Sequence, residues 1–263
     1  MEVAYYKKLF QTIGNIIELI EKDDIPKYLL FLENAFPYMD NYNYHKGMNG
    51  IIQELTGLLK KKNIGTDSDR ALLLDFQATL EIKPEKAIKL EKDALAQIEN
   101  ITADNARLVS NLHANLGGLY RMNGHPDLAR EHMEKSISLL DQFNLLHIND
   151  SIPQIANYAM FLTEQQEPER GISELQKLSG IIKEYHSDDC LDYAKVQETL
   201  GTIYLMTANL PQAKTHFKRA FKIYEKIWAD EPEMIEAKYQ EIQELYPQIG
   251  FCIGKNLSGL LTK

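Results

Sequence analysis

Cysteine and tryptophan are scarce in this chain, which has two cysteines and one tryptophan among 263 residues. Two cysteines, Cys190 and Cys252, are too few for the disulfide framework of a small secreted domain. Apolar runs near the roughly 20 residues that a membrane-spanning helix needs are also missing. The first residues lack the basic start and apolar centre of a signal peptide. These absences predict a cytoplasmic protein that does not enter a membrane.

The chain also has no excess of basic residues. It has 29 lysines and arginines and 38 aspartates and glutamates, which gives a formal net charge of −9. Binding to DNA or RNA relies on a clustered basic face. The one basic run, Lys60 to Lys62, is short and typical of a solvated helix end. We therefore predict no nucleic-acid partner. The acidic stretch 225–246 leaves two interpretations open, a solvated helix face or a site for a basic peptide.

Catalytic motifs are missing too. The chain has no Gly-rich phosphate loop followed by Lys-Ser/Thr, and no GxSxG, HExxH or paired CxxC motif. Its seven histidines are scattered, and His113 lies on an apolar helical face, where a half-buried structural histidine is expected. We predict that the protein is not an enzyme and has no catalytic site, no metal site and no cofactor.

The sequence does contain an internal repeat of 42 residues. Steps of 42 produce a column of leucine or tyrosine, a column of small residues and a column of prolines: Leu74, Leu116, Tyr158 and Leu200; Ala87, Ala129, Gly171 and Ala213; Pro84, Pro126 and Pro168. With only nine prolines in the chain, three in register by accident would be improbable. A fixed period of this length is the signature of a repeat architecture.

Each repeat is predicted to be a pair of helices. Leu112, Leu116 and Leu119 recur at spacings of three and four, which places them on one side of a helix. Pro126 then begins a second amphipathic stretch after a short turn. Asp104, Asp188 and Asp230, which lie on the same step of 42, are predicted to cap first helices. His132 and His216 lie 84 residues apart in the same repeat column, which indicates an equivalent surface position and favours a structural role over a metal pair.

These residues resemble the tetratricopeptide repeat family, whose signature is Leu-Gly-x-x-Tyr on the first helix and Ala…Phe…Ala on the second. The pattern is carried by Leu116, Gly117, Tyr120, Leu200, Gly201, Tyr204, Ala213, Phe217 and Ala220. The spacing of 42 is similar to that of the kinesin-light-chain type of repeat. The resemblance implies an all-α tetratricopeptide-repeat solenoid of helical hairpins, wound as a right-handed superhelix, with an N-terminal helical cap.

The predicted domains are a helical cap over 1–65 and a solenoid over 66–263. The repeat units are expected at about 67–100, 105–144, 150–183 and 190–227, with a partial unit over 230–263. Inside the cap we expect helices at about 2–22, 25–37 and 44–62, and a last helix at about 248–261. The cap is rich in aromatic residues, so a partner-binding surface is the alternative to simple closure of the first repeat.

The family resemblance implies a non-catalytic scaffold for protein–protein interaction that binds a peptide or partner segment in a concave groove lined by first helices. The predicted groove residues are Asn111, Asn115, Arg121, Asn157, Met160, Lys195, Thr199 and Thr202. An Asn amide can both donate to and accept from a peptide main chain, although an Asn here could instead bridge neighbouring helices. Methionine suits adaptable binding surfaces.

Two other functions stay open at this point. One is a peptide-sensing regulator similar to bacterial pheromone receptors, in which residues 1–65 would be the effector part. The other is a regulatory subunit of a separate enzyme. All three functions need a protein or peptide partner, and none requires a cofactor. Neither the oligomeric state nor the occupation of the groove by the N-terminal helices is predicted.

Overall fold

The structure is a computed structural model that describes residues 24–41 and 45–245. These residues form eleven α-helices: α2 (Ile25–Asn41), α3 (His45–Lys62), α4 (Asp67–Thr79), α5 (Pro84–Leu95), α6 (Ala106–Met122), α7 (Pro126–Gln142), α8 (Ser151–Glu164), α9 (Pro168–Tyr185), α10 (Leu191–Met206), α11 (Leu210–Ile227) and α12 (Pro232–Leu245). Consecutive helices pack as hairpins, which confirms the all-α repeat array. The expected helices 2–22 and 248–261 lie outside the described residues, and the handedness of a superhelix stays a prediction.

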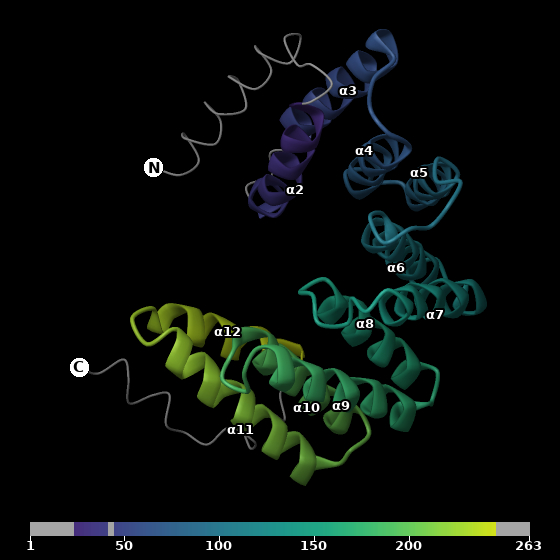
Figure 1. Cartoon of the computed structure of the whole chain (residues 1–263). Helices are drawn as coiled ribbons and strands as arrows, with labels where there is room; N and C mark the ends of the chain where they lie inside the picture. Colours follow the sequence, from purple (N-terminus) through teal and green to yellow (C-terminus); the bar gives the residue numbers. More distant parts are fainter. Residues whose placement is uncertain (1–23, 42–44, 246–263) are drawn as a thin grey trace. The chain divides into compact units, whose positions relative to one another are not determined.

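The chain forms two compact units, unit 1 over residues 1–136 and unit 2 over residues 137–263. The described helices of unit 1 are α2 to α6 and the start of α7, and those of unit 2 are the end of α7 and α8 to α12 (Figure 1). Each unit has its own buried clusters. In unit 2 a large cluster joins all the helices from α8 to α12, so this unit can be considered by itself.

In unit 1, α2 and α3 pack on α4. Leu32 of α2 and Ile52 of α3 are completely buried, in one cluster with Leu73 and Phe76 of α4. Helix α3 ends in the exposed Lys60–Lys62 run, as predicted. Helix α2 continues past Pro37 to Asn41, four residues beyond the predicted end at 37. A proline removes one helical hydrogen bond but does not always end a helix.

The turns inside the hairpins share one backbone feature, a residue with a positive φ angle. Gly124, Gln166 and Ala208 follow one another at intervals of 42 residues, and their φ angles are 72°, 65° and 60°. In each turn the next amide donates to a carbonyl of the preceding helix, for example from Asn209 to Tyr204 at 2.7 Å. This is the Schellman arrangement that satisfies the last carbonyls of a helix. It lets the second helix begin within three or four residues.

The predicted caps at Asp104 and Asp188 are wrong by one and two residues. The N-cap residues are Asn105 for α6 and Cys190 for α10. Cys190 Sγ accepts from the Tyr193 amide at 3.4 Å, whereas Asp188 pairs with Lys183 at 3.8 Å. The Asp column therefore lies in the loops before these helices.

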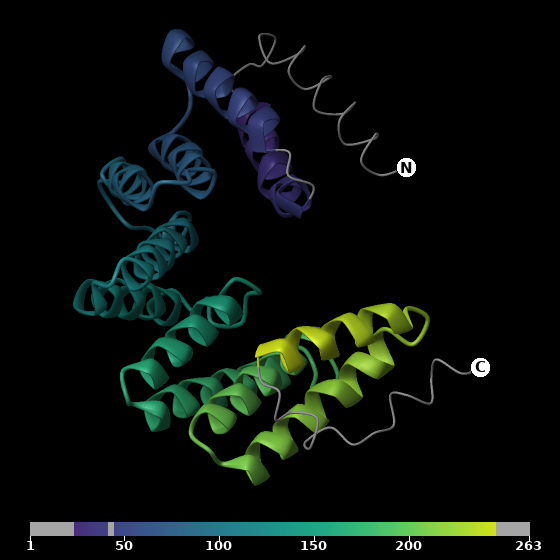
Figure 2. The ribbon, with the colours of Figure 1, turned by 180° about the vertical axis from the view of Figure 1, so that it is seen from behind.

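In unit 2, the small residues of the repeat are points of close helix approach. A Cβ atom added to Gly171 of α9 would lie 2.6 Å from the carbonyl oxygen of Ala159 in α8. One added to Gly201 of α10 would lie 2.9 Å from the Phe217 ring in α11. Helices α8 to α11 therefore pack as two tight hairpins, visible from behind in Figure 2.

Candidate functional site

The first helices of the two hairpins in unit 2 carry matching rows of residues that face solvent. These rows, which we call the first-helix face, are Pro153, Asn157, Met160 and Glu164 on α8 and, 42 residues later, Lys195, Thr199, Thr202 and Met206 on α10. Spacings of four, three and four keep each row on one side of its helix. All eight residues are exposed or half-buried, and α8 contacts α10 directly. The rows are therefore neighbours.

Five of the predicted groove residues lie on this face. Asn157 is exposed, and its amide has no hydrogen-bond partner among the described residues. The Lys195 ammonium lies 3.6 Å from Asp192, and the Thr199 hydroxyl donates to the Lys195 carbonyl at 3.0 Å. Met160 packs partly against the core, while Thr202 is half-buried. The face thus combines an available amide, hydroxyls, one cation and thioethers.

Helix α12 extends the face with exposed residues at the next step of the repeat, Ala237, Glu241 and Glu244. A network fixes it beside α10, because Glu198 accepts from Lys238 at 2.9 Å and from the Tyr224 hydroxyl at 2.6 Å. Burial, and secondly the charge of Glu198, raises the pKa of Tyr224, so this hydroxyl stays protonated. Glu198 therefore has a structural role beside the face.

In unit 1 the predicted residues of α6 already make contacts within the protein. The exposed Asn115 donates its side-chain N–H to Asp75 Oδ1 of α4 at 2.8 Å, so Asn115 bridges neighbouring first helices. Asn111 and Arg121 are half-buried and interact within the protein. Arg121 lies about a quarter of a turn to the side of Asn111 and Asn115 at 100° per residue.

On α4 the equivalent positions are covered by the chain itself. Leu73 and Phe76 occupy the columns of Asn115 and Gly118, and they are only 1% and 5% exposed beneath α2 and α3. Arg107 of α6 also pairs with Glu33 of α2 at 3.2 Å. The N-terminal helices therefore dock on the side of α4 that corresponds to the first-helix face.

Beneath Asn115 lies a pair of carboxyl groups that sequence reasoning missed. Asp75 of α4 hydrogen-bonds to Glu91 of α5, which is 1% exposed. Burial and the charge of Asp75 raise the pKa of Glu91 to about 10. Burial raises the pKa of Asp75 too, although the bonds from Glu91 and Asn115 oppose that rise. Burial at this contact thus shifts both pKa values upward.

The signal for this pair was present in the repeat. Asp75 falls 42 residues before Gly117, and Glu91 falls 42 residues before Met133. Two acidic residues in columns that are otherwise small or apolar indicate an exceptional contact, which a search for known catalytic motifs does not detect.

His113, His132 and His216 make contacts inside the hairpins, and His132 and His216 are half-buried there and not at the fully exposed surface. In unit 1 the Nδ1 atoms of His113 and His132 are 2.9 Å apart, and burial with the charges of His132 and Lys135 lowers the pKa of His113 to about 4. In unit 2 Gln197 takes the place of His113, and its Oε1 lies 2.9 Å from His216 Nδ1. Both His132 and His216 bind inside a hairpin.

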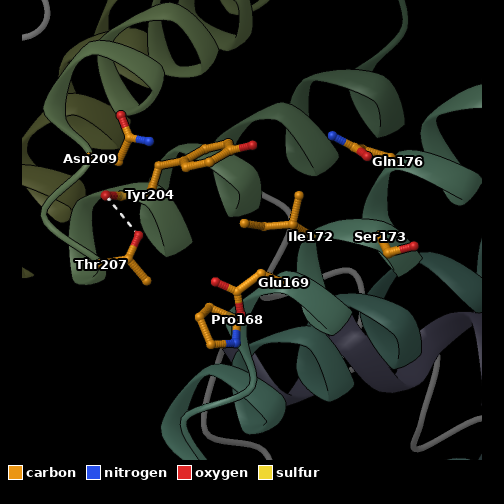
Figure 3. A pocket seen from close by; sticks show the side chains of 8 residues that line it. All are labelled: Pro168, Glu169, Ile172, Ser173, Gln176, Tyr204, Thr207 and Asn209. Atoms are coloured by element: carbon orange, nitrogen blue, oxygen red, sulfur yellow. Dashed lines mark hydrogen bonds between the residues drawn. The ribbon is translucent and has the colours of Figure 1, made fainter.

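A separate open pocket of about 430 Å³ lies in unit 2 between the start of α9 and the end of α10. It is lined by Pro168, Glu169, Ile172, Ser173, Gln176, Tyr204, Thr207 and Asn209. Figure 3 shows the Tyr204 side chain of α10 and Ile172 of α9 at this space. None of the predicted groove residues lines it, so the pocket is a second candidate surface.

Within residues 24–41 and 45–245, no group of three or more metal-ligating side chains is arranged to hold a metal ion. None of the described helices combines the length and the hydropathy needed to cross a bilayer. Most of the described residues with shifted pKa values lie at helix–helix contacts; the exceptions are Tyr28, whose hydroxyl has no partner among the described residues, and Asp189, an exposed loop residue that pairs with Lys226.

Comparison with known proteins finds the same kind of repeat in part of the chain. A tetratricopeptide repeat model matches residues 151–226, from α8 almost to the end of α11. Among curated protein sequences none matches. The structure of BtubC (BKLC) from P. vanneervenii is similar at a TM-score of 0.56 and 17% identity, over 86% of this chain and 84% of that chain.

Two structures of nearly identical TPR-like repeats from a putative kinesin light chain of Podosopora anserina are similar at 14% and 15% identity. Their TM-scores are 0.56 and 0.54, and they cover 77% and 74% of this chain and 98% and 96% of theirs. Identities this low establish the fold alone. The chain thus contains a stretch of tetratricopeptide repeats (TPR) at residues 151–226, and its fold has kinesin-light-chain-like structural neighbours. TPR domains are generally protein-interaction modules and are typically non-catalytic.

Proposed function

We propose that this TPR protein is a non-catalytic scaffold that binds a segment of a partner protein along the first-helix face of unit 2. The observation that carries the proposal is the contrast between equivalent helix faces. On α4 the face holds Leu73 and Phe76 and is covered by α2 and α3. On α8 and α10 it holds polar and thioether side chains and is open to solvent. The same side of a first helix thus already serves as a docking surface within the chain.

The chemistry of the open face favours an extended segment over an apolar helix. The Asn157 amide can donate to and accept from a peptide main chain, and the Thr202 hydroxyl can do the same. Met160 and Met206 can adapt to different side chains. Large aromatic or aliphatic anchors, which a docked amphipathic helix requires, are not found among the eight residues of the face. Recognition would therefore rest on main-chain hydrogen bonds.

The test is a tagged pull-down from lysate of the source cells, with partners identified by mass spectrometry. We expect Asn157→Ala/Thr199→Ala to weaken binding of the partner by about 5- to 100-fold, since each lost hydrogen bond contributes about 0.5–1.5 kcal/mol. The matched control is Gln176→Ala/Lys218→Ala, which truncates exposed residues of the second helices α9 and α11. Circular dichroism verifies equal helicity of all variants.

A partner that is kept by the control and lost by Asn157→Ala/Thr199→Ala supports the first-helix face. A partner that both variants keep contradicts it. Loss from the control alone would place binding at the second helices, where Gln176 lines the pocket beside Tyr204. Asn115→Ala is less suitable than Asn157→Ala, because it also removes a donor from Asp75.

A further inference from the structure

The first hairpin departs from a packing rule that the other hairpins follow. Where the first and second helices meet, α6 places Gly117 against Met133 of α7, and α10 places Gly201 against Phe217 of α11. In α4 and α5 the two equivalent positions hold Asp75 and Glu91. A contact between a small and a large apolar residue has thus been replaced by a contact between two carboxyl groups.

Glu91 has almost no access to water. It is 1% exposed, and its Oε2 atom has no hydrogen-bond partner among the described residues. An ionised carboxylate there would lose its hydration without replacement, which is far more costly than burial of a neutral carboxyl group. Asp75 is better satisfied, because Asn115 donates to its Oδ1 at 2.8 Å. A hydrogen bond from Asn115 also lowers the pKa of Glu91, but burial raises that pKa by more. The contacts therefore favour a charge on Asp75 and a proton on Glu91.

The charged groups around the pair do not neutralise a second carboxylate. From α2, Glu33 adds a negative charge that acts on Asp75. From α6, Arg107 pairs with Glu33 at 3.2 Å. Lys92 follows Glu91 on α5, but its ammonium lies over the Tyr120 ring of α6, 5.6 Å from the centroid. Glu33 of α2 thus adds a third acidic charge near the contact of α4 with α5.

We propose that Asp75 and Glu91 form a proton-binding site that holds one shared proton at neutral pH and keeps α4 packed on α5. When the proton leaves to solvent, two carboxylates face each other, with the charge of Glu33 nearby. Like charges this close repel strongly where little water screens them. Proton release therefore loosens both the α4–α5 hairpin and the docking of α2 on α4.

This site gives the stability of unit 1 an uncommon dependence on pH. The pKa of Glu91 is raised from 4.5 to about 10, so between these values the folded protein binds a proton that the unfolded chain has lost. The stabilisation is complete below about pH 4.5 and is lost as pH rises toward 10. At most, the equilibrium constant for unfolding rises about tenfold per pH unit.

The histidines change their protonation mainly below the pH range in which the Asp75–Glu91 pair is measured. Burial lowers the pKa of His113 to about 4 and also lowers the pKa values of His132 and His216. Their contribution to stability is lost as pH falls below about 6.5. Between pH 7 and 9 these histidines are mostly neutral in both the folded and the unfolded chain, so they add little to the pH dependence expected from Asp75 and Glu91.

The direct test is a carbon-13 NMR titration of the side-chain carboxyl groups in the full chain, with Glu91 assigned from the spectrum of Glu91→Gln. We expect the Glu91 carboxyl signal to titrate with a midpoint above pH 7. A midpoint between pH 4 and 5 would overturn the proposal. The titration itself is made on the unaltered protein, and Asp75→Gly/Glu91→Met supplies the assignment if Glu91→Gln does not fold.

Hydrogen exchange tests the structural consequence. From pH 7 to 9, after correction for intrinsic exchange, we expect protection of α4 and α5 amides to fall by up to about tenfold per pH unit. In Glu91→Gln protection should stay constant, because an amide donor replaces the shared proton. The control Asp93→Asn removes an exposed carboxyl from the same helix and should leave the fall unchanged.

A second variant covers the case in which Glu91→Gln does not fold. Asp75→Gly/Glu91→Met installs the pair found at Gly117 and Met133 in the next hairpin, and it should also abolish the fall in protection. If protection of the α4 and α5 amides falls equally in this variant and in the unaltered chain, other groups cause the pH dependence of the hairpin. The proposal would then be wrong.

Discussion

Replacing Phe217 with alanine is expected to destabilise unit 2 by about 3–5 kcal/mol, the usual cost of deleting a buried aromatic ring. Phe217 is completely buried, and its ring lies over Gly201 at the contact of α10 with α11. Because glycine offers no side chain that could move into the space, a cavity would remain. The lost contacts and the cavity would then both contribute to the cost.

The loss can be measured by urea unfolding, with the fluorescence of the single tryptophan as reporter. Trp228 follows α11 and stacks on Tyr224 with the ring centroids 4.8 Å apart, so it reports on unit 2. Lys218→Ala changes the exposed neighbour in the same helix, and its effect should stay within about 0.5 kcal/mol. A loss below about 1 kcal/mol for Phe217→Ala would contradict the assignment of the ring to this contact.

The second large effect concerns two glycines of α9 that should respond to the same substitution with opposite signs. A Cβ at Gly171 would lie 2.6 Å from the Ala159 carbonyl oxygen and 3.1 Å from its Cα. These are backbone atoms, so α8 and α9 would have to move apart. Overpacking of this kind costs about 1–3 kcal/mol.

Gly180 is the matched control, because a Cβ there would meet nothing within 4 Å. Gly180→Ala should stabilise the protein by about 0.5–1 kcal/mol through helix propensity alone. Urea unfolding followed at Trp228 measures both variants. Equal effects of Gly171→Ala and Gly180→Ala would mean that α8 and α9 do not approach at Gly171.

The hairpin array could be predicted because its determinants are local and recur. Apolar residues at spacings of three and four indicate helices, and Pro84, Pro126 and Pro168 mark where second helices begin. The left-handed residue that precedes them was harder to foresee. Gln166 and Ala208 adopt positive φ like Gly124, although neither residue type suggests it.

Contacts between distant residues of unit 1 could not be predicted from the repeat alone. The bond from Asn115 to Asp75 joins residues 40 positions apart, and the ion pair from Arg107 to Glu33 joins residues 74 apart. Helical periodicity sorts exposed from buried positions, but it does not say which partner lies opposite. The docking of α2 and α3 on Leu73 and Phe76 is of this kind.

For the candidate site too, the repeat register predicts which residues share a helix face but not which partners they contact. Asn157, Lys195 and Thr199 were selected by their register in the repeat, and they lie together on one exposed face. Asn115 has the same register, but it bridges to Asp75 because that residue is acidic where the other repeats have Gly117, Ala159 and Gly201. A departure from the repeat in one column thus changes the environment of a residue in another.

The central claim, that partners bind to the first-helix face, is tested most directly by site-specific photo-crosslinking in the source cells. A photoreactive amino acid is placed at Asn157 or Thr202 on the first helices and, in matched variants, at Gln176 or Lys218 on the second helices. The account predicts that the same partner is captured from positions 157 and 202 and not from 176 or 218. Capture of that partner from 176 or 218, with none from 157 and 202, would contradict it.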